Sequence, residues 1–397
     1  MARGPIAMVE PGVLHWLRTT SGLTIEEAAQ KLQTKPEILF AWEEGHERPS
    51  MPQLRKLAKA FKRPISYFFL PGPVEEPPIP HDFRRQQSAG DRRYSPALLH
   101  EIRTAYRRRS LAIDLAKETG KAVTPFESFA SVSPSDDAEE VGQRLRDIVN
   151  LTTDEQSRWR QPRNAYNGWR QRIEAQGVLV FQITTVELSQ MLGFSLAYRD
   201  LPVIGVNRKN RLNGRTFTML HEFAHLMLGR SGVCDIEESL PRALSEQRVE
   251  VFCNHVAGAA MVPASHLLVH PLVSVHESGA RNWADEEISV LSRDFGTSEE
   301  VIVRRLLINQ LTTTDFYASK RAEYQARNAQ LAQRERERNR ADDDFRRNMA
   351  QEAVSNLSSF ARLVIESYHS DIINLSEASK HLGVRAEKVA AVDSLVR

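Results

Sequence analysis

Two histidines four positions apart, with a glutamate directly after the first, have the clearest chemistry in this chain. They occur as His221-Glu222-Phe-Ala-His225 within an apolar segment that has helical spacing. Residues i and i+4 of a helix share one face, so both imidazoles can bind a single Zn²⁺. Glu222 would then lie beside the open coordination position and accept a proton from the water that zinc activates. The pattern predicts a zinc-dependent hydrolytic centre.

Such a centre needs a third protein ligand. Metzincins have a third histidine six residues after the second, and Ser231 stands at that position here. This excludes the metzincin class. The gluzincin arrangement remains, in which a glutamate from a later helix completes the site.

The helix predicted between Glu246 and Pro263 can supply that glutamate. Small residues at 257–260 would let it pack closely against the helix that carries the histidines. Glu246 and Glu250 lie one turn apart on one face, so their spacing does not choose between them. Weaker candidates are Glu237 and His255.

Composition limits what the rest of the chain can be. The 397 residues suggest two or three domains, and the hydrophobic content of 41% is typical of globular protein. A net charge of +2 requires any nucleic-acid-binding surface to be local. Two cysteines, Cys234 and Cys253, exclude a disulfide framework or a cysteine-rich zinc site and are typical of a reducing compartment.

Targeting signals are not evident in the sequence. No apolar run reaches the roughly 18 residues that a membrane-spanning helix needs, and the N-terminus lacks the apolar core of a signal peptide. We therefore expect a cytoplasmic protein with no membrane partner.

Residues that typically begin or end helices are frequent in the first 70 residues. Thr24 and Glu27 predict a capping box, Pro36 and Gly45 mark the start and end of the next helix, and a third apolar stripe begins at Leu54. This layout resembles the XRE-type (Cro-like) helix-turn-helix, with Trp42-Glu-x-Gly45 and Pro49-Ser-x-Pro-x-Leu54 carrying much of the match.

The resemblance implies that the N-terminal module binds a double-stranded DNA operator as a homodimer. The residues that would lie at or near the groove, or touch phosphates, are Thr34, Lys35, Glu37, Ile38, Ala41, Arg48 and Lys56. A small helical bundle for protein contacts is the alternative. Residues 1–70 carry 10 basic and 7 acidic residues, so their net charge is only +3. Three of the acids, Glu43, Glu44 and Glu47, would repel phosphate if they faced it.

The metal motif also belongs to a longer pattern. His221-Glu-Phe-Ala-His225, Glu250-x-x-Cys-Asn254 and Met261-Val-Pro263 together resemble the ImmA/IrrE family of zinc peptidases. The phrases Gly193-Phe-Ser and Pro202-Val-Ile-x-Val-Asn207 are similar too. The resemblance implies that Zn²⁺ is held by His221, His225 and Glu250, and that Glu222 is the catalytic base.

The order of the two modules is similar to the fused XRE–peptidase subgroup. This implies cleavage of a protein substrate, an XRE-type repressor or the chain itself, in response to stress. It also implies a toxin encoded nearby as a further partner. The alternative is a non-proteolytic repressor or antitoxin, whose metal domain senses a signal or binds a toxin.

We expect an α+β protein that is mainly α. Residues 1–75 would form a five-helix DNA-binding bundle, and residues 76–160 a Pro-rich linker and helical connector. Residues 161–315 would form a gluzincin-like peptidase domain with a small β-sheet, including strands near 177–182 and 202–207. Residues 316–397 would form a charged spacer and a C-terminal helical region.

Three lesser features are interpreted as structural. The segments 290–307 and 377–392 predict packed helix pairs, and the arginines of 84–109 a solvated helix face. Cys253 is interpreted as a packing residue.

Overall fold

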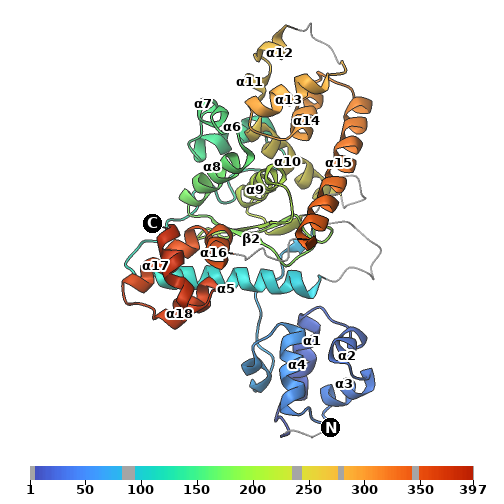
Figure 1. Ribbon diagram of the computed structural model, residues 1–397, viewed down its shortest axis with the longest axis vertical. Coiled ribbons are helices and arrows are strands. Elements are labelled where there is room, and N and C mark those ends of the chain that lie inside the picture. Colours follow the sequence, from blue (N-terminus) through green and yellow to red (C-terminus); the bar gives the residue numbers. More distant parts are fainter. Residues whose placement is uncertain (1–4, 83–93, 235–243, 276–280, 342–347, 397) are drawn as a thin grey trace. The chain divides into compact units, whose positions relative to one another are not determined.

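The computed structural model describes residues 5–82, 94–234, 244–275, 281–341 and 348–396 (Figure 1). They divide into two compact units, the first mainly residues 5–79 and the second mainly residues 108–184 and 191–396. Helices predominate, and one mixed sheet lies in the second unit. The predicted class, α+β and mainly α, is confirmed. No described helix is long and apolar enough to cross a membrane.

The first unit contains the expected five-helix bundle. Its elements are α1 (Pro11–Thr20), α2 (Ile25–Leu32), α3 (Pro36–Glu43), α4 (Met51–Phe61) and the 3₁₀ helix η1 (Ile65–Phe69). The capping box is present, because the Thr24 side chain accepts from the Glu27 amide and the Glu27 carboxylate accepts from the Thr24 amide. Leu17, Leu39 and Leu54 are fully buried between the helices, so one apolar core holds the module together.

An ion pair inside this core joins α1 to α3. Arg18 donates from Nε to Glu43 Oε1 at 2.7 Å and from Nη2 to Glu43 Oε2 at 2.9 Å, and both side chains are buried. His15 contacts the same carboxylate at 3.0 Å. Glu43 is therefore committed to the core and is not one of the acids that could face phosphate.

Glu43→Gln should loosen this module. The substitution leaves the buried Arg18 without a charged partner, so the free energy of opening α1 and α3 should fall by about 2–4 kcal/mol. Native-state hydrogen exchange of their amides measures it. The exposed neighbour Glu44→Gln is the control and should change little; equal protection in both variants would contradict a structural role for the pair.

The sheet of the second unit has the order β1-β5-β3-β4-β2. The strands are β1 (His81–Asp82), β2 (Leu179–Ile183), β3 (Gly193–Leu196), β4 (Val203–Asn207) and β5 (Gly232–Cys234). β2 and β4 confirm the two predicted strands and pair in parallel, whereas β3 runs antiparallel to both β4 and β5. β3 and β5 were not predicted, because three or four residues carry too little periodicity.

Two helices dominate the core of this unit. Helix α9 (Leu212–Met227) packs on β3 and β4, and α10 (Leu244–Met261) packs on α9 and on α6 (Ala138–Ile148). Small residues allow this approach, since a Cβ added to Gly142 would lie 2.5 Å from Ala259 Cβ. The small residues at 257–260 were expected to pack against the helix that carries the histidines, but this close contact joins Ala259 to Gly142 of α6.

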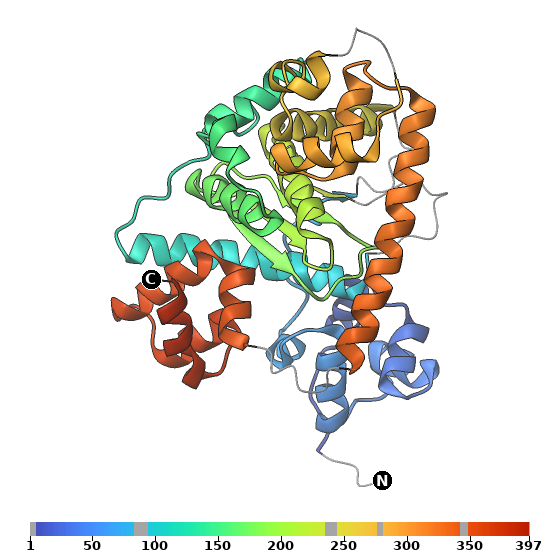
Figure 2. The ribbon, with the colours of Figure 1, turned by 45° about the horizontal axis from the view of Figure 1, so that its top comes forward.

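The remaining helices belong to the second unit, except that α5 extends across the division between the two units. They are α5 (Pro96–Glu118), α7 (Thr153–Ser157), α8 (Pro162–Ala175), α11 (Ala264–Leu267), α12 (Pro271–Ser274), α13 (Asp285–Asp294), α14 (Glu299–Ile308), α15 (Thr314–Ala341), α16 (Met349–Leu357), α17 (Ser359–His369), α18 (Leu375–Leu382), η2 (Ala386–Lys388) and α19 (Val389–Val396). The pair α13–α14 and the cluster α16–α19, drawn in red in Figure 2, confirm the predicted helical packing.

The interpretation of the Arg-rich segment needs correction. Residues 83–93 lie outside the described part of the chain, but several later arginines are packed rather than simply solvated. Arg103 donates to the Thr20 carbonyl at 2.9 Å. Arg109 stacks over the Tyr198 ring at 3.8 Å and donates to the Asp200 carbonyl. Flat guanidinium groups bind carbonyls and aromatic rings together, which explains why these two arginines are half-buried.

Candidate metal centre

Helix α9 places the two motif histidines on one face. Its residues from Thr218 to Met227 are all buried, because the helix lies between the sheet, α8 and α10. The Nε2 atoms of His221 and His225 are 3.1 Å apart, and their ring centroids are 4.9 Å apart. The i, i+4 spacing therefore brings both imidazoles to one point, as predicted.

Helix α10 brings Glu250 to the same point. Glu250 Oε1 lies 3.0 Å from His225 Nε2, and Glu250 Oε2 lies 3.5 Å from His221 Nε2. Glu246, one turn earlier, is not in this cluster. The structure thus favours the glutamate that the family resemblance implies. Of the weaker candidates, His255 pairs with Glu139 at 2.7 Å, and Glu237 lies outside the described residues.

Asn254, one turn after Glu250 on α10, supports the first histidine. Its Oδ1 lies 2.9 Å from His221 Nδ1, so His221 can donate from Nδ1 and present the lone pair of Nε2 to a metal. Cys253 is fully buried beside His225. It belongs to the packing around that ring and is not one of the clustered donors.

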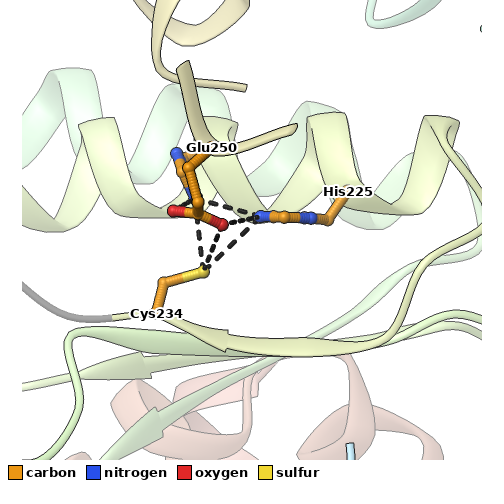
Figure 3. A group of neighbouring side chains, drawn as sticks. His225, Cys234 and Glu250 are labelled. Atoms are coloured by element: carbon orange, nitrogen blue, oxygen red, sulfur yellow. Dashed lines mark hydrogen bonds and ion pairs between the residues drawn. The ribbon is translucent and has the colours of Figure 1, made fainter. Parts of the chain in front are cut away.

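A fourth donor group, which the sequence analysis did not assign, comes from strand β5. Cys234 Sγ lies 3.3 Å from His221 Nε2, 3.5 Å from His225 Nε2 and 3.7 Å from Glu250 Oε1. Figure 3 shows the thiol rising from the strand toward the other donors. A single cysteine has no ligand spacing to recognise, and the strand that aims it was itself too short to predict.

The four donor groups fit one zinc ion. The six pairs of residues have donor atoms 3.0 to 3.7 Å apart, with Glu250 Oε1 facing His225 and Cys234 and Glu250 Oε2 facing His221. One donor atom from each of the four residues lies within 4.8 Å of the others. Donors in a zinc tetrahedron, at bonds of about 2.0–2.1 Å to nitrogen or oxygen and about 2.3 Å to sulfur, lie about 3.3–3.6 Å apart. Two imidazoles, a carboxylate and a thiol are also the donor types that Zn²⁺ takes in proteins.

Glu222 lies next to this cluster and is fully buried. Burial raises the pKa of Glu222 to about 7; the positive charge of His225 opposes this shift, and the negative charge of Glu250 adds to it. The Ser195 hydroxyl and the Cys234 thiol lie beside its carboxylate, but neither oxygen has a hydrogen bond of good geometry among the described residues. The carboxylate is thus available to a proton donor at the cluster.

A glycine makes room for Glu222. A Cβ added to Gly193 on β3 would lie 2.5 Å from Thr218 Cγ2 and 2.8 Å from Glu222 Oε1. A side chain at this position would force the Thr218 and Glu222 side chains, or the helix that carries them, to shift. The Gly193-Phe-Ser phrase therefore marks the place where the sheet accepts the helix.

The residues expected to contact DNA are displayed by the first unit. Lys35, Glu37, Arg48 and Lys56 are exposed, and Thr34, Ile38 and Ala41 are half-buried. Phe40 on α3, which was not among the residues predicted to contact DNA, is 53% exposed. A large apolar side chain on the exposed face of a recognition helix is suited to contact thymine methyl groups.

The fold and the site together define a class of protein domain. A His-Glu-x-x-His helix on a mixed sheet, completed by a glutamate from a second helix, is typical of gluzincin-like metallopeptidase domains.

Family comparisons agree with that class. Residues 173–307 match a peptidase family described as the IrrE N-terminal-like domain, and residues 14–68 match a helix-turn-helix family. The chain therefore carries an XRE-type helix-turn-helix domain followed by an IrrE-like peptidase domain. No curated protein and no solved structure matches the chain significantly.

His221→Ala should weaken zinc binding by more than about 100-fold, because it removes a donor from a four-donor cluster. Competition with a chromophoric chelator measures the affinity. Glu246→Ala, on the same helix as Glu250 but outside the cluster, should bind zinc like the unmodified chain. Equal affinity in both variants would refute the ligand assignment.

Proposed function

We propose that this chain is a cytoplasmic transcriptional regulator whose IrrE-like domain is a zinc-dependent endopeptidase. It would cleave an XRE-type repressor, either another protein or the chain itself, in response to stress. The observation that carries the proposal is the placement of Glu222, fully buried beside the donor cluster. A structural zinc site would not require a carboxylate at this place.

The residues at the cluster would have two roles, metal binding and proton transfer. His221, His225 and Glu250 would hold Zn²⁺, which when bound supplies a Lewis acid for the water and the scissile carbonyl. Glu222 would accept the proton of the attacking water and pass it to the leaving amide nitrogen. The buried walls around it would exclude bulk water, which strengthens each of these interactions.

The N-terminal domain would direct the regulator to an operator. Helix α3 presents Lys35, Glu37 and Phe40 on its exposed side, a suitable arrangement for a recognition helix in the major groove. Because Glu43 is bound to Arg18, it would not oppose this approach. A homodimer on a palindromic operator would supply the affinity that a single domain of modest charge lacks.

A second candidate function is favoured by Cys234. A fourth protein donor at the cluster is typical of a structural or sensory zinc site. The chain would then be a non-proteolytic repressor or antitoxin, whose metal domain senses a signal or binds a toxin encoded nearby.

Glu222→Gln separates the two functions. The amide keeps the size of the side chain but cannot accept the proton of water, so cleavage of a true substrate should fall by about 10²–10⁴-fold. Zinc content and operator binding should stay unchanged. If derepression in cells persists in Glu222→Gln but disappears in His221→Ala, the metal is sensory and the peptidase proposal is wrong.

Two substitutions in the N-terminal domain should act differently on DNA binding. Lys56→Ala should weaken binding to all sequences alike and reduce the salt slope by about 1, because it removes one phosphate contact. Phe40→Ala should leave the slope unchanged and reduce discrimination between sequences by about 1–3 kcal/mol. Fluorescence anisotropy with the full chain, on a duplex obtained by genomic selection, measures both. The reverse pattern would overturn the proposal that α3 is the recognition helix.

A further inference from the structure

The thiol of Cys234 contacts three donor atoms almost equally. Its distances to the two imidazole nitrogens and to the Glu250 carboxylate oxygen span only 3.3 to 3.7 Å. A thiol has one proton and can donate one hydrogen bond at a time. A single hydrogen bond would draw the sulfur toward one partner, whereas a cation shared by all four donor atoms accounts for the even spacing.

The same sulfur lies where a hydrolytic site needs its water. The attacking water must touch both the metal and the general base. Cys234 Sγ contacts the donors His221, His225 and Glu250, and its thiol lies beside the Glu222 carboxylate. The thiol and the water would therefore compete for one position.

The sheet fixes this thiol in place. Cys234 is the last residue of β5 and pairs with Gly193 of β3, and its carbonyl accepts a hydrogen bond from the Leu192 amide at 2.9 Å. The side chain is 4% exposed. Its approach to the cluster is therefore set by strand register rather than by a loose surface loop.

We propose that Cys234 is the fourth protein ligand of the zinc ion and occupies the coordination position that a hydrolytic site leaves to water. When the metal binds, the Sγ–H proton passes to solvent and a sulfur–zinc bond forms. Opening the site breaks that bond, the thiolate takes a proton back from solvent, and a water molecule takes the coordination position. The resting centre is thus closed. Resting on the proposed function, this closure keeps the peptidase latent until the Cys234 side chain turns away.

Cobalt substitution of the full-length chain tests the ligand. Co²⁺ bound by a thiolate shows a charge-transfer absorption in the near ultraviolet that nitrogen and oxygen donors alone do not produce. We expect this band in the unmodified chain and in Cys253→Ala, and its loss in Cys234→Ala with the cobalt content still near one per chain. Cys234→Ser, of nearly the same size as cysteine, serves if the alanine variant does not fold. Absence of the band from the unmodified chain, or its persistence in Cys234→Ala, would overturn the proposal.

Cleavage assays separate this proposal from the proposed function. The substrates are the Glu222→Gln chain and XRE-type repressors encoded near its gene. Zinc-loaded Cys234→Ala should cleave them at least about tenfold faster than the unmodified chain does, because the fourth coordination position of its zinc is open to water. Adding Glu222→Gln to this variant should abolish the gain. Equal rates in the unmodified chain and Cys234→Ala would overturn the latency. A cobalt–thiolate band together with no cleavage by any variant would uphold the fourth ligand and refute the peptidase function.

Discussion

Helix α9 lies so close to strand β3 that a Cβ at position 193 would overlap two side chains of the helix. Gly193 has no side chain where a Cβ would meet Thr218 and Glu222, so the helix can bring its carboxylate and both histidines onto the sheet. A second small-residue contact, Gly142 against Ala259, seats α10 beside α6. Protein interiors are closely packed and hardly compressible, so a shift at one such contact moves the neighbouring elements. The absence of two side chains thus decides where four donor groups from three elements meet.

The charge of the cluster gives a second constraint. Glu222 and Glu250 are buried close together, and burying carboxylates without a positive partner is costly. A divalent cation among the donors would reduce this negative charge and satisfy the lone pairs that the imidazoles present. Metal affinity and the stability of the second unit would therefore be linked, as expected where ligands come from separate elements.

The sequence predicts those parts of the site that repeat a pattern. Helical spacing predicts the histidine pair, alternative glutamates one turn apart leave a choice that the family resemblance resolves, and β2 and β4 are long enough to recognise. Cys234 has no such signal, because its position depends on a three-residue strand whose pairing is a long-range property. The exposure of Phe40 and the burial of Glu43 could not be predicted from the sequence for a related reason. Their neighbours across the bundle, rather than their own spacing, decide that Phe40 is exposed and Glu43 is buried.

The pairing of Cys234 with Gly193 has a consequence for how such domains can diverge. Side chains alternate between the two faces of a strand, so a shift of one residue in β5 would turn the thiol to the opposite face and bring the neighbouring position toward the histidines. No ligand codon would change. A single insertion or deletion near this strand could thus convert a four-donor centre into a three-donor one. Descendants of one gene could then exchange sensing for hydrolysis through a change in the pairing of one short strand, with every ligand residue kept.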